Sequence, residues 1–189
     1  MIKPLFVLLF RLITEPALSW GFLSEDQKKD NEDFYRSYLF PIIGFIALLS
    51  FVGVLISSKH FSTALALKVV IRQVVVYLGS FYLVSFVVSE YLFPRFDLEK
   101  DRIPAERFTG YSSALIYAVA MIEAMFPSFF FLEIIVFYTI YIIWTGAGRF
   151  LRIYEEQWIK FTIFASILIM LAPYFIRLLI DVFMPNMKV

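Results

Sequence analysis

Apolar residues form long continuous runs along this chain, separated by short polar segments. A helix rises about 1.5 Å per residue, so crossing a hydrocarbon core of about 30 Å takes about 20 apolar residues. Five runs meet this length approximately: residues 38–58, 69–88, 109–126, 129–150 and 161–183. The runs do not alternate with polar residues, which excludes a β-barrel. The pattern predicts an all-α, polytopic membrane protein whose residues 38–189 form one bundle of five transmembrane helices.

Two proline-containing segments set the predicted connections. Pro127 interrupts an apolar region that is too long for one span, so the third and fourth spans are predicted to form a tight hairpin. Residues 94–108, PRFDLEKDRIPAERF, alternate in charge and contain two prolines. This composition predicts a solvated connector between the second and third spans.

Residues 1–37 are predicted to form a separate arm and linker ahead of the bundle. The apolar segment PLFVLLF, residues 4–10, is too short to span a membrane before Arg11 interrupts it. Pro16 follows Glu15 as a helix start, with proline in the first turn and a carboxylate at the positive end of the helix dipole. A cleaved signal peptide is the alternative, but the two charged residues within this region disfavour it.

The second short helix of the arm is predicted to be amphipathic. Ala17, Trp20 and Leu23 fall close to one face, with Leu18 and Phe22 beside it. Trp20 is expected at headgroup level, with the arm lying on the cytoplasmic leaflet. A charged linker is expected from residue 24 to residue 36. The same pattern also fits an arm that packs against the bundle, and the sequence leaves these two arrangements open.

Basic residues are distributed unevenly between the two ends of the predicted bundle. Twelve precede the first span or lie in the loops after the second and fourth: Lys3, Arg11, Lys28, Lys29, Arg36, Arg95, Lys100, Arg102, Arg107, Arg149, Arg152 and Lys160. Five lie on the other side: Lys59, Lys68, Arg72, Arg177 and Lys188. Because Lys and Arg are enriched in cytoplasmic loops, the N terminus is predicted to be cytoplasmic. Five spans then place the C terminus outside.

Composition narrows the function classes. The chain is 61% hydrophobic and contains 23 Phe and 11 Tyr, which favours contact with lipid. A net charge of +1 argues against nucleic acid as a partner. The absence of Cys excludes disulfides and thiolate sites, and His60 is the single histidine. No metal or cofactor is therefore expected, and no nucleophile, zinc or phosphate-loop motif indicates an enzyme.

Ionisable residues within the spans are the default functional candidates in a membrane protein. Glu123 and Glu133 flank the Pro127 turn and are expected near the outer face, either reaching water or forming a cation or proton site. Arg177 and Asp181 are spaced i, i+4 and are predicted to pair along one helix. The glycines of TGAGRF, residues 145–150, are predicted to allow a close helix contact.

Four residues in two segments support a family resemblance. Pro16 and Trp20 lie in TEPALSW, ahead of the spans, and Gly110 and Tyr111 open GYSSALIYAVAMIEAMFP, after the central loop. The layout resembles the Yip1 family, whose bacterial members share these features. The resemblance implies five helices and a cytoplasmic N terminus. Eukaryotic members contact Rab GTPases in vesicle traffic, but this chain lacks their long cytoplasmic domain and its Asp-Leu-Tyr-Gly-Pro motif, and no catalytic residue can be transferred.

The function expected from the sequence is a non-enzymatic role in interaction or membrane organisation. The bilayer is the expected partner, and a protein could bind through the arm and the cytoplasmic loops. The alternative is a small transporter or channel that uses Glu123, Glu133 or Arg177, with an intramembrane hydrolase third. The expected location is a bacterial inner membrane.

Overall fold

The computed structural model describes residues 2–25, 31–57 and 62–183, and every regular element within these ranges is helical. In chain order they are α1 (Ile2–Thr14), α2 (Pro16–Glu25), α3 (Asn31–Phe34), the π-helical η2 (Tyr35–Leu39), α4 (Phe40–Ser57), α5 (Thr63–Val87), the π-helical η3 (Val88–Leu92), α6 (Phe93–Arg95), α7 (Arg102–Ser112), α8 (Ala114–Met125), the 3₁₀-helical η4 (Pro127–Tyr138), α9 (Thr139–Arg149) and α10 (Glu155–Phe183). The predicted all-α fold class is confirmed.

The described helices include four that are long and apolar enough to cross a membrane. They are Asn31–Ser57, Thr63–Arg95, Pro127–Arg149 and Glu155–Phe183. A fifth span is obtained when α7 and α8, which meet at an angle of 47°, are counted as one broken span. Long apolar helices of this kind are typical of a membrane protein.

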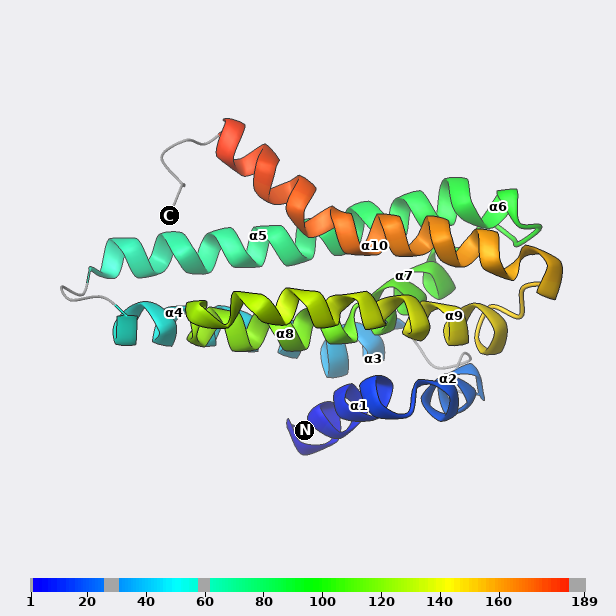
Figure 1. Cartoon of the computed structure of the whole chain (residues 1–189), viewed down its shortest axis with the longest axis horizontal. Coiled ribbons are helices and arrows are strands. Elements are labelled where there is room, and N and C mark those ends of the chain that lie inside the picture. The colour runs from blue at the N-terminus through cyan, green and yellow to red at the C-terminus, as the bar shows by residue number, and fades with distance from the viewer. Residues whose placement is uncertain (1, 26–30, 58–61, 184–189) are drawn as a thin grey trace.

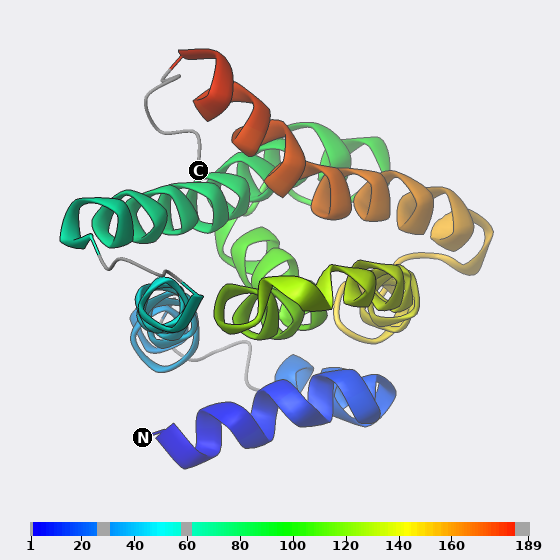
Figure 2. The same ribbon diagram turned by 60° about the vertical axis from the view of Figure 1, so that its left-hand side comes forward.

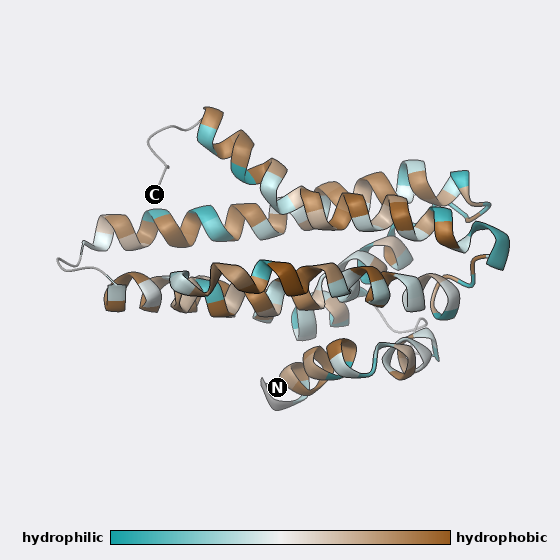
Figure 3. Ribbon diagram, in the orientation of Figure 1, coloured by the Kyte–Doolittle hydropathy of each residue, from teal (hydrophilic) through white to brown (hydrophobic). Residues whose placement is uncertain are grey.

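The helices pack in three tiers (Figures 1 and 2). The arm helices α1 and α2 lie on one side, α5 and α10 on the opposite side, and α4, α8 and α9 between them. We call the end that carries α6 and the α9–α10 connection the arm end, and the opposite end the hairpin end. Hydrophobic residues cover much of the long helices, whereas polar residues gather where α10 begins (Figure 3).

The arm belongs to the same hydrophobic core as the bundle. Leu5, Leu9 and Leu12 of α1 are buried together with residues of α4 and α8. Phe6, on the neighbouring face, meets Phe45 of α4 edge to face at 5.0 Å. The arm therefore packs along the flank of the bundle, which is the second of the two arrangements that its sequence allows.

Two predicted polar connectors are wrong over part of their length. The expected linker from residue 24 to residue 36 is helical from Asn31 onward and continues through η2 into α4, while residues 26–30 lie outside the described ranges. The expected connector at residues 94–108 begins within α6, is helical again from Arg102, and is buried in α7 from Ala105 onward. Asp101 caps α7, because its Oδ1 accepts a hydrogen bond from the Ile103 N–H at 2.9 Å.

The predicted hairpin at Pro127 is confirmed. α8 ends at Met125, Phe126 is non-helical, and η4 begins at Pro127. α8 also approaches α4 closely near this turn, because a Cβ placed on Gly53 would collide with the backbone carbonyl of Ala124. A side chain at Gly53 would therefore separate the two helices.

We predict that Gly53→Ala lowers the free energy of unfolding by about 1–3 kcal/mol, the usual cost of overpacking a core. Gly44→Ala is the matched control on the same helix, because a Cβ there has no neighbour within 4 Å. The control should be neutral or slightly stabilising, since alanine favours a helix over glycine by up to about 1 kcal/mol. Thermal unfolding midpoints in detergent would measure both, and equal midpoints would contradict the close approach.

Candidate functional site

Trp20 fixes the arm to the bundle. Its side chain is fully buried, and its Nε1–H donates a hydrogen bond to the carbonyl oxygen of Ile142 at 2.9 Å. Gly146, one turn further along α9, leaves room for the ring, since a Cβ there would lie 2.7 Å from the indole. α9 provides both a notch for the ring and an acceptor for its N–H, so Trp20 is buried among helices, and its expected depth at headgroup level stays a prediction.

Other aromatic rings complete the surroundings of Trp20. Phe108 of α7 stacks on the indole at 5.7 Å, and Tyr111 meets it edge to face at 6.1 Å. The preceding residue, Gly110, packs directly against Phe34, whose ring would lie 2.5 Å from an added Cβ. Three of the four residues that carry the family resemblance, Trp20, Gly110 and Tyr111, therefore lie together, although about 90 residues separate Trp20 from the other two. Pro16, the fourth, is buried at the start of α2.

The predicted small-residue patch in TGAGRF does permit close contacts. Both of its glycines face tryptophan rings, Gly146 that of Trp20 and Gly148 that of Trp158. The Trp158 Nε1–H donates to the carbonyl oxygen of Trp144 at 2.6 Å, and the two indoles stack at 5.0 Å. The glycines thus admit side chains from α2 and α10.

A cavity of about 490 Å³ lies between the arm and the bundle, and we call it the arm cavity. Its polar lining residues come from both sides of this junction: Arg11, Ser19, Asp33, Ser37, Arg107 and Tyr111. Arg107 is only 6% exposed, whereas Arg11 is exposed on α1. The arm cavity therefore combines two guanidinium groups with one carboxylate, in a setting walled elsewhere by apolar side chains of α1, α2 and α3.

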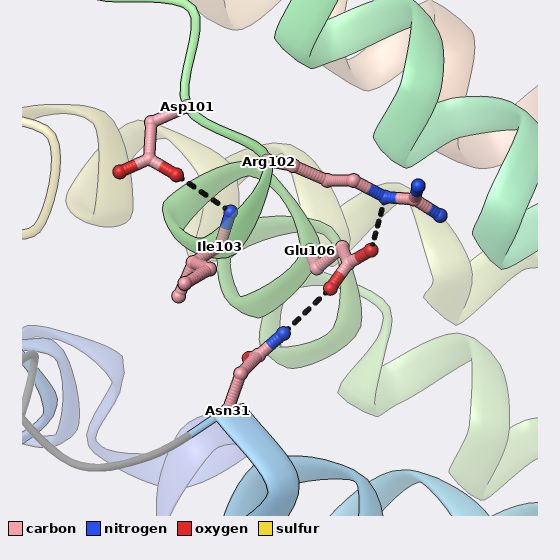
Figure 4. A network of polar contacts seen from close by, with 5 residues as sticks. All are labelled: Asn31, Asp101, Arg102, Ile103 and Glu106. Carbon is pink, nitrogen blue, oxygen red and sulfur yellow. Dashed lines mark hydrogen bonds and ion pairs between the residues drawn. The ribbon is translucent and has the colours of Figure 1, made fainter.

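A buried carboxylate beside the arm cavity is held by hydrogen bonds (Figure 4). Glu106 is 3% exposed, and its Oε1 accepts from Arg102 Nε at 2.6 Å while its Oε2 accepts from Asn31 Nδ2 at 2.7 Å. Oε2 of Glu106 thereby joins α7 to α3, whereas Oε1 pairs with Arg102 one turn earlier in α7. A buried charge paired in this way is expensive to break.

A second cavity, of about 330 Å³, lies at the hairpin end, and we call it the Glu123 cavity. Its polar lining residues are Arg72, Gln73, Tyr77, Glu123 and Arg177. Glu133 joins Glu123 and Arg177 around an adjoining small cavity of about 20 Å³. The structure therefore brings together Glu123, Glu133 and Arg177, the candidate ionisable residues of three different predicted spans.

The polar residues of the Glu123 cavity pair across helices. Asp181 forms an ion pair with Arg72 of α5 at 2.7 Å, which corrects its expected pairing with Arg177 along α10. Arg177 instead donates a hydrogen bond to the hydroxyl of Tyr77 at 3.0 Å. Glu123 keeps one carboxylate oxygen buried and without a hydrogen-bond partner among the described residues.

Arg107 and Arg72 line these cavities but were not among the residues singled out from the sequence. Asp101, a favourable N-cap residue seven positions before Phe108, is the signal that could have revealed a helix around Arg107. Arg72 carries no comparable local signal, because its partner is 109 residues away. The comparisons add no further residues, since no family model, no curated protein and no solved structure matches this chain.

We predict that Trp20→Ala releases the arm. Removing a fully buried tryptophan should cost about 3–5 kcal/mol of unfolding free energy, whereas Phe22→Ala, at a position that is 67% exposed, should change it little. The chain contains no Cys, so Leu9→Cys can report on the buried face of α1. Maleimide should label this cysteine slowly in the parent and rapidly with Trp20→Ala. Slow labelling in both would show that α1 is held without Trp20.

Proposed function

We propose that this chain is a non-enzymatic integral membrane protein, similar to the Yip1 family, that acts in membrane organisation or protein interaction through its arm. The docked arm is the observation that carries the proposal. One face of the arm is locked to the bundle through Trp20, while apolar side chains elsewhere on the arm are exposed: Val7, Phe10, Leu18 and Phe22. Exposed apolar patches of this kind mark contacts with lipid or with a partner protein.

The contact that this face favours is lipid. Phe10 is 67% exposed on a helix whose other side is buried against membrane-spanning helices. An aromatic face placed there would otherwise lie unfavourably in water. Protein partners would bind at the same end, through the arm and the polar connections beside it.

The proposed orientation places the arm end in the cytoplasm of a bacterium, with the C terminus outside the inner membrane. Its support is the excess of basic residues at the arm end, where Arg95, Arg102, Arg149 and Arg152 lie. The Yip1 resemblance supports the same orientation. The meeting of Trp20, Gly110 and Tyr111 gives the residues behind that resemblance a common structural role.

We predict a distinct labelling pattern for three single-cysteine variants in intact cells. A membrane-impermeant maleimide should label Ser128→Cys at the hairpin directly, and Glu99→Cys at the arm end only after permeabilisation. Phe10→Cys should resist labelling in both conditions, because lipid covers it. The reverse pattern for the first two would overturn the orientation, and rapid labelling of Phe10→Cys after permeabilisation would remove the lipid contact.

A small transporter or channel is the second candidate function, favoured by the convergence of Glu123 and Arg177 on one cavity. Arg72 and Asp181 form an ion pair, however, and Arg177 donates a hydrogen bond to Tyr77. The adjoining cavities toward the middle of the bundle measure only about 20 and about 10 Å³. These features favour a static polar cluster over a conduction path.

We predict no proton- or cation-dependent flux in liposomes that contain the parent protein. The variant Glu123→Gln with Glu133→Gln should have nearly the same unfolding temperature as the parent, because glutamine preserves the shape of each side chain. Empty liposomes provide the background rate. Flux above this background that disappears in the double variant would make the transporter the better assignment.

A further inference from the structure

We infer that the C-terminal part of α10 is a hinged flap over the Glu123 cavity, which opens to admit water to the Glu123 carboxylate. The flap consists of residues 174–183, and its hinge is Pro173. The residues that form this device belong to α5, α8 and α10 rather than to the arm, so the inference goes beyond the proposed function and does not depend on it.

A proline inside α10 provides the hinge. Pro173 has no N–H, so the carbonyl oxygen of Ile169 loses the hydrogen bond that would close this helical turn. The proline ring also crowds that carbonyl, which bends a helix away from its axis. Figures 1 and 2 show the last turns of α10, coloured red, diverging from α5. Bending at this point therefore costs less than bending elsewhere along α10.

The burial of α10 changes at the hinge. The part that ends there contributes these buried residues to the bundle: Phe161, Thr162, Ala165, Ser166, Ile169, Ala172 and Pro173. Within the flap only Ile180 is buried, while Ile176 is partly buried and faces Gly79 of α5. A segment with few buried contacts can separate from the bundle while the rest of the helix stays packed.

Two polar contacts hold the flap against α5. Arg72 forms an ion pair with Asp181, with 2.7 Å between Nη2 and Oδ1, and Arg177 donates a hydrogen bond to the Tyr77 hydroxyl at 3.0 Å. The ion pair is partly exposed, with 20% of the Arg72 side chain and 30% of the Asp181 side chain accessible. Separating such a pair costs less than separating a fully buried one. These contacts therefore act as a reversible latch.

The cavity beneath the flap contains a polar atom that water would stabilise. Arg177 is the residue that α10 contributes to its lining, and α5, α8 and η4 form the other walls. Glu123 Oε1 is buried without a hydrogen-bond partner among the described residues. Buried polar atoms of this kind are normally satisfied by protein or by ordered water. In the closed state the polar cluster is static, and opening gives access from one side without creating a path across the bundle.

The first test measures access to the cavity in the whole chain in detergent. The chain contains no Cys, so Ala120→Cys places one thiol in the cavity wall at a position that is 4% exposed. A water-soluble methanethiosulfonate reagent should modify this thiol slowly. Asp181→Ala should raise the rate by about tenfold, as expected when one hydrogen bond between charged groups is lost. Lys68→Ala is the matched control, because it removes an exposed charge from α5 outside the cavity lining.

The second test measures the movement of the flap. Spin labels on Leu67→Cys of α5 and Val182→Cys of the flap occupy two exposed positions on the two sides of the latch. Double electron–electron resonance should show a longer distance population with Asp181→Ala than in the parent. Adding Pro173→Ala should reduce that population, because alanine restores the hydrogen bond to the Ile169 carbonyl and stiffens the helix.

Two controls separate opening of the flap from damage to the whole bundle. A reference pair of labels at Phe86→Cys and Ile163→Cys, exposed positions on α5 and on the packed part of α10, should keep its distance in every variant. Arg72→Asp combined with Asp181→Arg retains an ion pair between the helices and should restore slow modification of Ala120→Cys.

Three results would overturn the inference. The first is an unchanged modification rate and unchanged distances with Asp181→Ala. The second is a reference pair that lengthens as much as the flap pair, because the bundle as a whole would then have loosened. The third is fast modification that persists in the charge-swap variant, which would show that the ion pair is not the latch. Each of these results leaves the proposed role of the arm intact.

Discussion

A helix of 13 residues cannot cross a bilayer, and the structure of the arm end follows from that constraint. At about 1.5 Å per residue, α1 is about 20 Å long, against a hydrocarbon core of about 30 Å. Its buried face must pack against other helices, and the chain must turn back before the next span. Trp20 makes this arrangement stable by placing one large ring and one hydrogen bond in a notch of α9. The arm cavity is the space that remains beside this contact.

The broad fold could be predicted from the sequence because insertion depends on the summed hydropathy of a segment. The long apolar runs and the break at Pro127 are signals of this local kind. The first half of α7 was predicted to lie in a solvated connector, because its charged residues are typical of a segment exposed to water. Glu106 is buried only because Asn31, 75 residues away in the sequence, and Arg102 supply its hydrogen bonds. A charged residue therefore indicates exposure only when neither a local ion pair nor a distant hydrogen bond can satisfy it in the folded chain.

The candidate sites were predicted less completely than the fold. Glu123, Glu133 and Arg177 could be selected because any charge within a span is unusual, and the structure brings them together. The ion-pair partner of Asp181 could not be identified from the sequence. Arg177 lies four residues away on the same helix, whereas the actual partner, Arg72, lies on a different helix. Trp20 presents the same difficulty. Amphipathic periodicity identifies the face that it occupies, but a headgroup region and a glycine-lined notch are equally suitable for an indole.

The distance along the chain between Trp20 and its acceptor has a consequence for biogenesis. The two residues are 122 positions apart, so Ile142 has not been synthesised when the arm leaves the ribosome. At about 5–20 residues per second, the delay is roughly 6 to 24 s. During this interval the indole has no notch to enter, and the membrane surface is the most favourable place for it. The arm can therefore dock only after the fourth span, which contains α9, has joined the bundle. The first helices of the chain thus reach their final positions late in assembly.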